Sequence, residues 1–142
     1  MSQEIYALGG NRTALFAERF LDRFLPARAP YADDFPVPES SDDPEVVHDS
    51  VGDLLIYLEK HPEEPYGIYW NSKDPDSNDQ AMLFYTRDGK VIFGLACEEN
   101  EAEARARDLK EFVGATYLLM SWEQRPPDLS ADFIALCARN PN

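Results

Sequence analysis

Two uniformly apolar segments, 80–86 and 91–97, stand on either side of the dipeptide Asp88-Gly89. An Asp-Gly pair is typical of tight β-hairpin turns, because both of its residues tolerate positive φ. We therefore predict a β-hairpin with a two-residue turn. Its register would place Phe84 opposite Phe93. This hairpin constrains the fold more than any other feature of the sequence.

The predicted register makes both faces of the hairpin apolar. One face carries the larger side chains, which must be core: Met82, Phe84, Val91, Phe93 and Leu95. The other face is flatter and carries Ala81, Leu83, Tyr85, Ile92, Gly94 and Ala96. Apolar patches of this size are rarely left in water. We expect a helix of the same chain, or else a partner protein, to cover the flatter face.

The rest of the chain alternates between helical and strand patterns. Apolar residues at helical spacing predict helices at 12–25, 50–61 and 100–113, and a last helix that begins with Ser130 as its N-cap. Aromatic and β-branched runs predict strands at 66–71 and 115–122. The 142 residues suffice for one domain. We predict a single α+β domain, residues 1–142, with a four-stranded, mostly antiparallel sheet and about four helices packed on it.

Residues 27–49 form an acidic, proline-rich segment that fits neither pattern. Four prolines, at positions 30, 36, 38 and 44, fix φ and bias their preceding residues towards extended backbone. We predict an irregular strap that lies over the domain and is anchored by Tyr31, Phe35 and Val37.

The negative charge of the chain is concentrated in one quarter of its length. Residues 31–65 hold eleven acids and one base, Lys60, which accounts for −10 of the net charge of −14. This balance argues against binding to nucleic acid or to an anionic membrane, since both need an excess of Lys and Arg. A field of one sign can steer a basic protein partner to the surface. The plainer reading is a solvated surface that keeps an acidic protein soluble.

Candidate partner-binding residues come from the acidic strap and from the aromatic strand that follows it. Carboxylates of the strap would capture a cation, and Tyr or Trp side chains would supply contact energy. The set is Asp33, Asp34, Asp42, Asp43, Tyr66, Tyr69 and Trp70. If Ile68 faces the core, strand alternation sends Tyr66 and Trp70 inward and Tyr69 outward; the opposite parity exposes Tyr66 and Trp70. The sequence leaves this choice open.

The other chemical patterns are weaker. Asp74–Gln80 places oxygen ligands at alternate positions, as at the start of a calcium loop, but Asp79 stands where that loop needs glycine. A polar connection with Asx turns explains the same residues. His48 and His61 are expected on the surface, and Cys97 and Cys137 as buried free thiols, with a disulfide as the alternative. An acid–base role for Glu123 beside Trp122 has little support, because solvated carboxylates keep ordinary pKa values.

The sequence thus predicts a binding protein without catalytic activity, cofactor or metal. The leading hypothesis is a small acidic cytoplasmic protein that recognises a basic protein surface, for example an immunity protein or inhibitor of a cationic toxin. One alternative is a self-associating structural or regulatory domain, with the flatter sheet face as a homodimer interface; another is a small-molecule or calcium-binding domain. Either a monomer or a homodimer is compatible with the sequence. The N-terminal residues lack the pattern of a secretory signal, and no apolar run is long enough to span a membrane.

Overall fold

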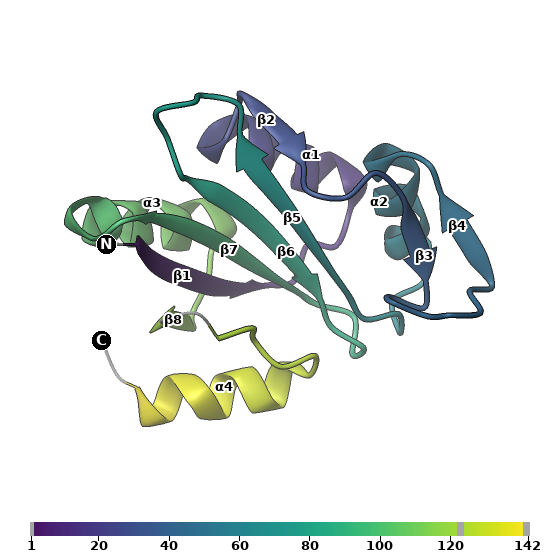
Figure 1. The fold of residues 1–142 in the computed structure, drawn as a ribbon. Coiled ribbons are helices and arrows are strands. Elements are labelled where there is room, and N and C mark those ends of the chain that lie inside the picture. Colours follow the sequence, from purple (N-terminus) through teal and green to yellow (C-terminus); the bar gives the residue numbers. More distant parts are fainter. Residues whose placement is uncertain (1, 122–123, 141–142) are drawn as a thin grey trace.

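The structure is a computed structural model, and it describes residues 2–121 and 124–140. Within these ranges a six-stranded sheet has the order β2-β5-β6-β7-β1-β8, with antiparallel neighbours throughout (Figure 1). Its strands are β1 (Ser2–Gly9), β2 (Arg28–Pro30), β5 (Tyr66–Ser72), β6 (Gln80–Tyr85), β7 (Val91–Glu98) and β8 (Leu118–Ser121). A separate two-stranded ribbon is formed by β3 (Phe35–Val37) and β4 (Val46–His48). The helices are α1 (Ala14–Phe24), α2 (Val51–Lys60), α3 (Ala102–Val113), preceded by the 3-10 turn η1 (Glu99–Glu101), and α4 (Ser130–Arg139).

The predicted α+β class, the four helices and the antiparallel sheet are confirmed, but the prediction of four strands is wrong. The largest omission is β1, which lies between β7 and β8 and is buried on both faces. A strand of this kind reads as a short continuous apolar run, because neither face supplies the polar residues that would create an alternation. The short β2 was hidden by the prolines around it, and β8 begins three residues later than predicted.

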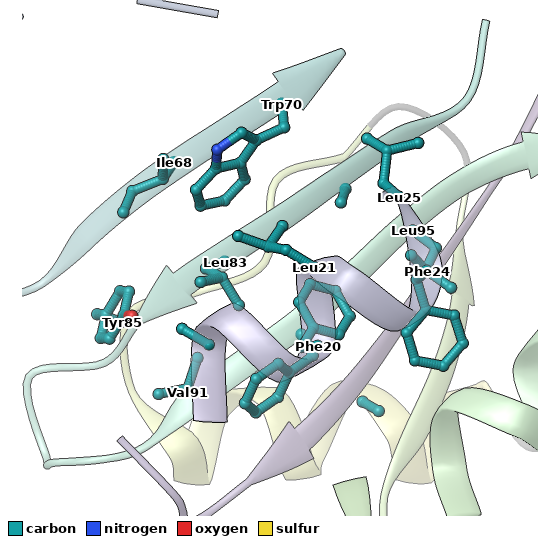
Figure 2. Packing of buried hydrophobic residues seen from close by; sticks show 14 of the residues in the cluster. Phe20, Leu21, Phe24, Leu25, Ile68, Trp70, Leu83, Tyr85, Val91 and Leu95 are labelled. Carbon is teal, nitrogen blue, oxygen red and sulfur yellow. The ribbon is translucent and has the colours of Figure 1, made fainter. Parts of the chain in front are cut away.

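The helices cover both faces of the sheet. Helices α1, α2 and α3 pack on one face, where Phe20 and Leu21 of α1 lie over Leu83 of β6 (Figure 2). Helix α4 packs on the other face (Figure 1). Its Phe133 is fully buried in a cluster with side chains of β1, β6 and β7. The second apolar face is therefore covered by a helix of the same chain, and that face is not open for a homodimer contact.

The register of the β6–β7 hairpin differs by one residue from the prediction. Phe84 lies opposite Ile92, and Leu83 lies opposite Phe93. The loop has three residues rather than two: Thr86 closes it by donating its backbone N–H to the carbonyl of Lys90, and its hydroxyl accepts the Lys90 N–H. Since a shift of one residue exchanges the faces of one strand relative to the other, the predicted composition of both faces is wrong. Ala81, Leu83 and Tyr85 share a face with Val91, Phe93 and Leu95, and Met82 and Phe84 share the α4 face with Ile92 and Ala96.

The loop keeps the positive φ that the dipeptide predicted, but only at its glycine. Gly89 has φ 89°, whereas the φ of Asp88 is not positive. A three-residue hairpin loop commonly ends with a glycine in this left-handed conformation, which provides the extra residue of a β-bulge.

We predict that Gly89→Ala lowers the free energy of unfolding by about 1–2 kcal/mol, the usual cost of left-handed backbone for an L-residue. The added Cβ would be 3.7 Å from its nearest neighbour, Pro62, so the cost comes from the backbone and not from a clash. Gly10→Ala is the matched control, because its φ is not positive and a Cβ there meets nothing within 4 Å. Urea denaturation of both variants measures their free energies of unfolding. Equal values for the two would contradict the loop assignment.

The same loop holds the beginning of α4. The prediction that Ser130 is the N-cap is wrong, because Leu129 occupies that position. Ser130 instead donates both its backbone N–H (3.2 Å) and its hydroxyl (3.0 Å) to Asp88 Oδ1. Burial raises the pKa of the Asp88 carboxyl, but hydrogen bonds from Thr86 and Ser130 outweigh burial and leave that pKa below its ordinary value. The ionised Asp88 therefore stabilises the docked helix.

The lowered pKa of Asp88 gives a pH-dependent prediction. A carboxyl whose pKa is lower in the folded state contributes stability above its unfolded pKa, and that contribution is lost as the pH falls through the folded pKa. Compared with Asp88→Asn, the natural protein should have the higher melting temperature at pH 6, and the difference should narrow towards pH 3. Asp76→Asn, an exposed loop position, is the control. A constant difference across this pH range would contradict the role of the ionised carboxyl.

The strap is shorter and more ordered than predicted. Phe35 and Val37 are buried in the core as expected, on strand β3, which pairs with β4. Tyr31 is not an anchor: its side chain is 73% exposed, although its backbone N–H continues the pairing of β2 with β5 by donating to the Tyr69 carbonyl. Ser50 is the N-cap of α2, and its hydroxyl accepts the backbone N–H of Asp53.

One buried cation joins the acidic part of the chain to the sheet. Arg12, just before α1, directs all five of its guanidinium N–H groups to backbone carbonyl oxygens at 2.7–3.2 Å, and its guanidinium lies 4.9 Å from the ring centre of Tyr85. The acceptors are Leu58, His61, Glu64, Thr86 and Lys90. Two of these carbonyls end α2, where a helix leaves its carbonyls without internal partners and carries a partial negative charge. Arg12 therefore connects α2 to the hairpin loop without a carboxylate partner.

We predict that Arg12→Met lowers the free energy of unfolding by roughly 3 kcal/mol or more, because each buried carbonyl left unsatisfied costs about 1–3 kcal/mol. Arg12→Lys should also destabilise, since an ammonium group cannot reach five acceptors in this planar arrangement. Arg19→Met is the control, an exposed arginine of α1, the helix that follows Arg12. Denaturation in urea measures all three; a change below about 0.5 kcal/mol for Arg12→Met, the range of neutral surface substitutions, would contradict the assignment.

Candidate protein-binding surface

The unpaired negative charge is gathered at one end of the molecule. The segment 31–65 builds β3, β4 and α2, which lie together beside the β5 edge of the sheet (Figure 1). Asp33, Asp34, Asp42 and Asp43 are all exposed there. Of the eleven acids in this segment, only Glu39 forms an ion pair with a described residue. The other ten form no ion pair with a described residue, and Arg12 offsets part of the field only at Glu63 and Glu64, so most of this charge is available to a partner.

The structure settles the parity of the aromatic strand. Ile68 faces the core, and Tyr66 (4% exposed) and Trp70 (1%) face it too, as one of the two alternatives required (Figure 2). Trp70 packs in the core beside α1, so it does not offer an exposed surface to a partner. Tyr69 points to the opposite face, where its ring makes an edge-on contact with Phe84 and remains partly exposed.

A groove lies between the strap and the outer edge of β5. β2 pairs only with residues 70–72, so the first half of β5 has β6 on one side and no strand on its outer side. Strap residues 31–40 run along this open edge and leave the groove between themselves and Tyr66–Tyr69. Three tyrosines and two acids line it: Tyr31, Tyr66, Tyr69, Asp34 and Glu39. The groove therefore combines aromatic rings with negative charge.

Glu39 and Arg125 close one end of this groove. The Glu39 carboxylate accepts two N–H groups of Arg125, at 2.7 and 3.0 Å, and also the backbone N–H of Gly67 at 2.9 Å. The pairing with Glu39 raises the pKa of Arg125 above its ordinary value. Gly67 has a specific role here, since a Cβ at this position would lie 2.8 Å from Arg125 Nη2. The Glu39 carboxylate thus accepts the backbone N–H of Gly67, which would otherwise be open to pairing with a further strand at this edge.

Hydrogen exchange tests this closure directly. We predict that Glu39→Ala accelerates exchange of the Gly67 amide about tenfold, because the change removes a charge-assisted hydrogen bond that is worth roughly 1.5 kcal/mol or more. Glu45→Ala, an exposed acid of the same segment without a side-chain partner, should leave this amide unchanged. An unchanged Gly67 rate in Glu39→Ala would show that the carboxylate does not protect the edge.

The Asp74–Gln80 loop is organised by its own hydrogen bonds. Asp74 Oδ1 accepts the backbone N–H of Asp76 at 2.9 Å, which is an Asx turn, and Asp79 forms an ion pair with Arg105 at 3.3 Å. Among the described residues no group of three or more His, Cys, Asp or Glu side chains is placed to hold a metal ion. The polar-connection reading of this loop accounts for the contacts that are present.

The two histidines lie on either side of one tyrosine. Tyr57 stacks on His61 with ring centres 3.9 Å apart, and its ring lies 5.0 Å from that of His48. Both histidines are half-buried rather than fully on the surface, and His48 Nε2 has no hydrogen-bond partner among the described residues. Of the two free cysteines, Cys97 is buried and Cys137 is half-buried. The suggested pair of Glu123 and Trp122 lies outside the residues that the structure describes.

Comparison with protein-family models, with curated proteins and with solved structures finds no match for this chain. Helices that combine the length and apolar character needed to cross a membrane do not occur in ranges 2–121 and 124–140.

The structure brings together only part of the predicted set. Asp34 and Tyr69 share the groove with Tyr66, whereas Asp42 and Asp43 lie in the turn between β3 and β4, and Trp70 is buried. Sequence reasoning missed Tyr31 as an exposed ring, and it missed Glu39 with its partner Arg125. No local pattern could have linked those two charges, which are 86 positions apart.

Proposed function

We propose that this chain is a binding protein that recognises a basic surface on another protein, and that an inhibitor or immunity protein of a cationic toxin is the concrete form of this role. The observation that carries the proposal is the segregation of charge. Ten acids of one continuous segment form no ion pair with a described residue, and they lie at one end of the fold. A surface of this kind attracts a partner of opposite charge and raises the rate of encounter.

The arrangement of the remaining charges supports a specific surface over general solubility. Elsewhere in the described chain, ion pairs join acids to arginines: Arg23 with Asp108, Arg28 with Glu18 and Asp22, Arg87 with Asp128, and Arg105 with Asp79. Solubility alone would be served by charges spread over the surface with both signs mixed. The acidic end departs from that pattern.

The test is capture of proteins from a lysate of the source organism at about 50 mM and about 500 mM salt, with retained proteins identified by mass, because screening weakens exposed charge pairs at the higher salt. We predict that a basic protein is retained at low salt and much less at high salt. The double variant Asp42→Lys/Asp43→Lys should retain about tenfold less of it, as expected when electrostatic steering is lost.

The matched control is Asp76→Lys/Glu111→Lys, which changes the net charge by the same amount at exposed positions outside the acidic end. This control should retain the partner as the natural protein does. Equal losses in both double variants would show that net charge alone matters, and retention of no basic protein at low salt would contradict the proposed function.

A further inference from the structure

We infer that the groove along the open edge of β5 receives an arginine side chain of the basic partner, with Asp34 as its counter-charge and Tyr31 and Tyr69 as its aromatic walls. This inference rests on the proposed function and names the chemistry of its contact. Its test, given below, separates the two.

The charge of the groove is complementary to an arginine. Asp34 lines the groove, is exposed, and forms no ion pair with a described residue. Glu39, which also lines it, already holds a guanidinium, that of Arg125, in a two-pronged pair. Asp34 is therefore the carboxylate of the groove that is left for an incoming cation.

The aromatic lining of the groove also suits an arginine side chain. Tyr31 has the highest exposed fraction of the large hydrophobic side chains in the described chain, 73%, and its backbone N–H is fixed to the Tyr69 carbonyl at 2.9 Å. Exposed rings held on a firm backbone are typical of protein-recognition surfaces, because few torsions are lost on binding. The face of a tyrosine ring attracts a guanidinium, which stacks on it more readily than a lysine ammonium does.

Tyr66 adds a third ring to the lining of the groove. Burial, followed by the charges of Glu39 and Asp34, raises the pKa of Tyr66 to about 12, so its hydroxyl is protonated and adds no negative charge to that of the carboxylates.

A small probe tests the groove without the partner. Titration of the isotope-labelled protein with N-acetyl-arginine amide, followed by the backbone amide signals, should produce saturable shifts at Tyr31, Gly67 and Tyr69. N-acetyl-citrulline amide has nearly the same shape without the charge, and it should bind at least fivefold more weakly. Asp34→Asn should weaken binding of the arginine probe to a similar degree.

The aromatic wall has its own variant and control. Tyr31→Leu should weaken the arginine probe about two- to fivefold, the effect of one exposed cation–π contact. Tyr117→Leu, an exposed tyrosine (37%) outside the groove, should leave binding unchanged. Shifts of equal size around Asp42 and Asp43, or equal binding of the citrulline probe, would overturn the groove assignment. The proposed function would still stand if capture of a basic protein depended on Asp42 and Asp43.

Discussion

The guanidinium of Arg12 is the contact on which the arrangement of the acidic end depends. Its five hydrogen bonds join the end of α2 and the turn that follows it to the β6–β7 loop, which is more than 20 residues further along the chain. The same loop holds the N-terminus of α4 through Asp88. One buried cation thus connects the layer of α2 on one face of the sheet with the layer of α4 on the other.

This arrangement also explains how a crowded acidic segment can fold. Its apolar residues Phe35, Val37, Leu54, Leu55 and Leu58 are buried in the main core, so hydrophobic burial fixes the segment although its charges repel one another. Arg12 donates hydrogen bonds to the carbonyls at the end of α2, so these carbonyls need no other partner. The carboxylates of the segment face solvent. The excess charge is therefore a property of the surface and does not disturb the core.

Much of the fold follows from local patterns in the sequence, and the errors occur where longer-range contacts decide. Apolar spacing predicted the helices well: Ser50 caps the beginning of α2, and Gly114, with φ 70°, ends α3. The hairpin was recognised from Asp88-Gly89, but the hydroxyl of Thr86 closes a longer loop, and this one interaction changed the register. The strand β1 escaped prediction because it is buried on both faces.

The candidate site was less predictable than the fold. Charge density alone located Asp33, Asp34, Asp42 and Asp43 on the surface, since unpaired carboxylates are costly to bury. Strand alternation reduced the aromatic residues to two alternatives, and only the packing of Ile68 against the core decided between them. The pair of Glu39 and Arg125 depends on the three-dimensional meeting of two segments, for which the sequence carries no local signal.

The most direct test of the central claim is a comparison of amide hydrogen exchange in the free protein and in its complex with the captured partner. The account expects protection on binding to concentrate in residues 31–49 and along the β5 edge at 66–69. It expects no change in α3 or on the outer surface of α4. Protection confined to α3 and α4, with unchanged exchange in the acidic segment, would show that recognition takes place elsewhere and would contradict the account.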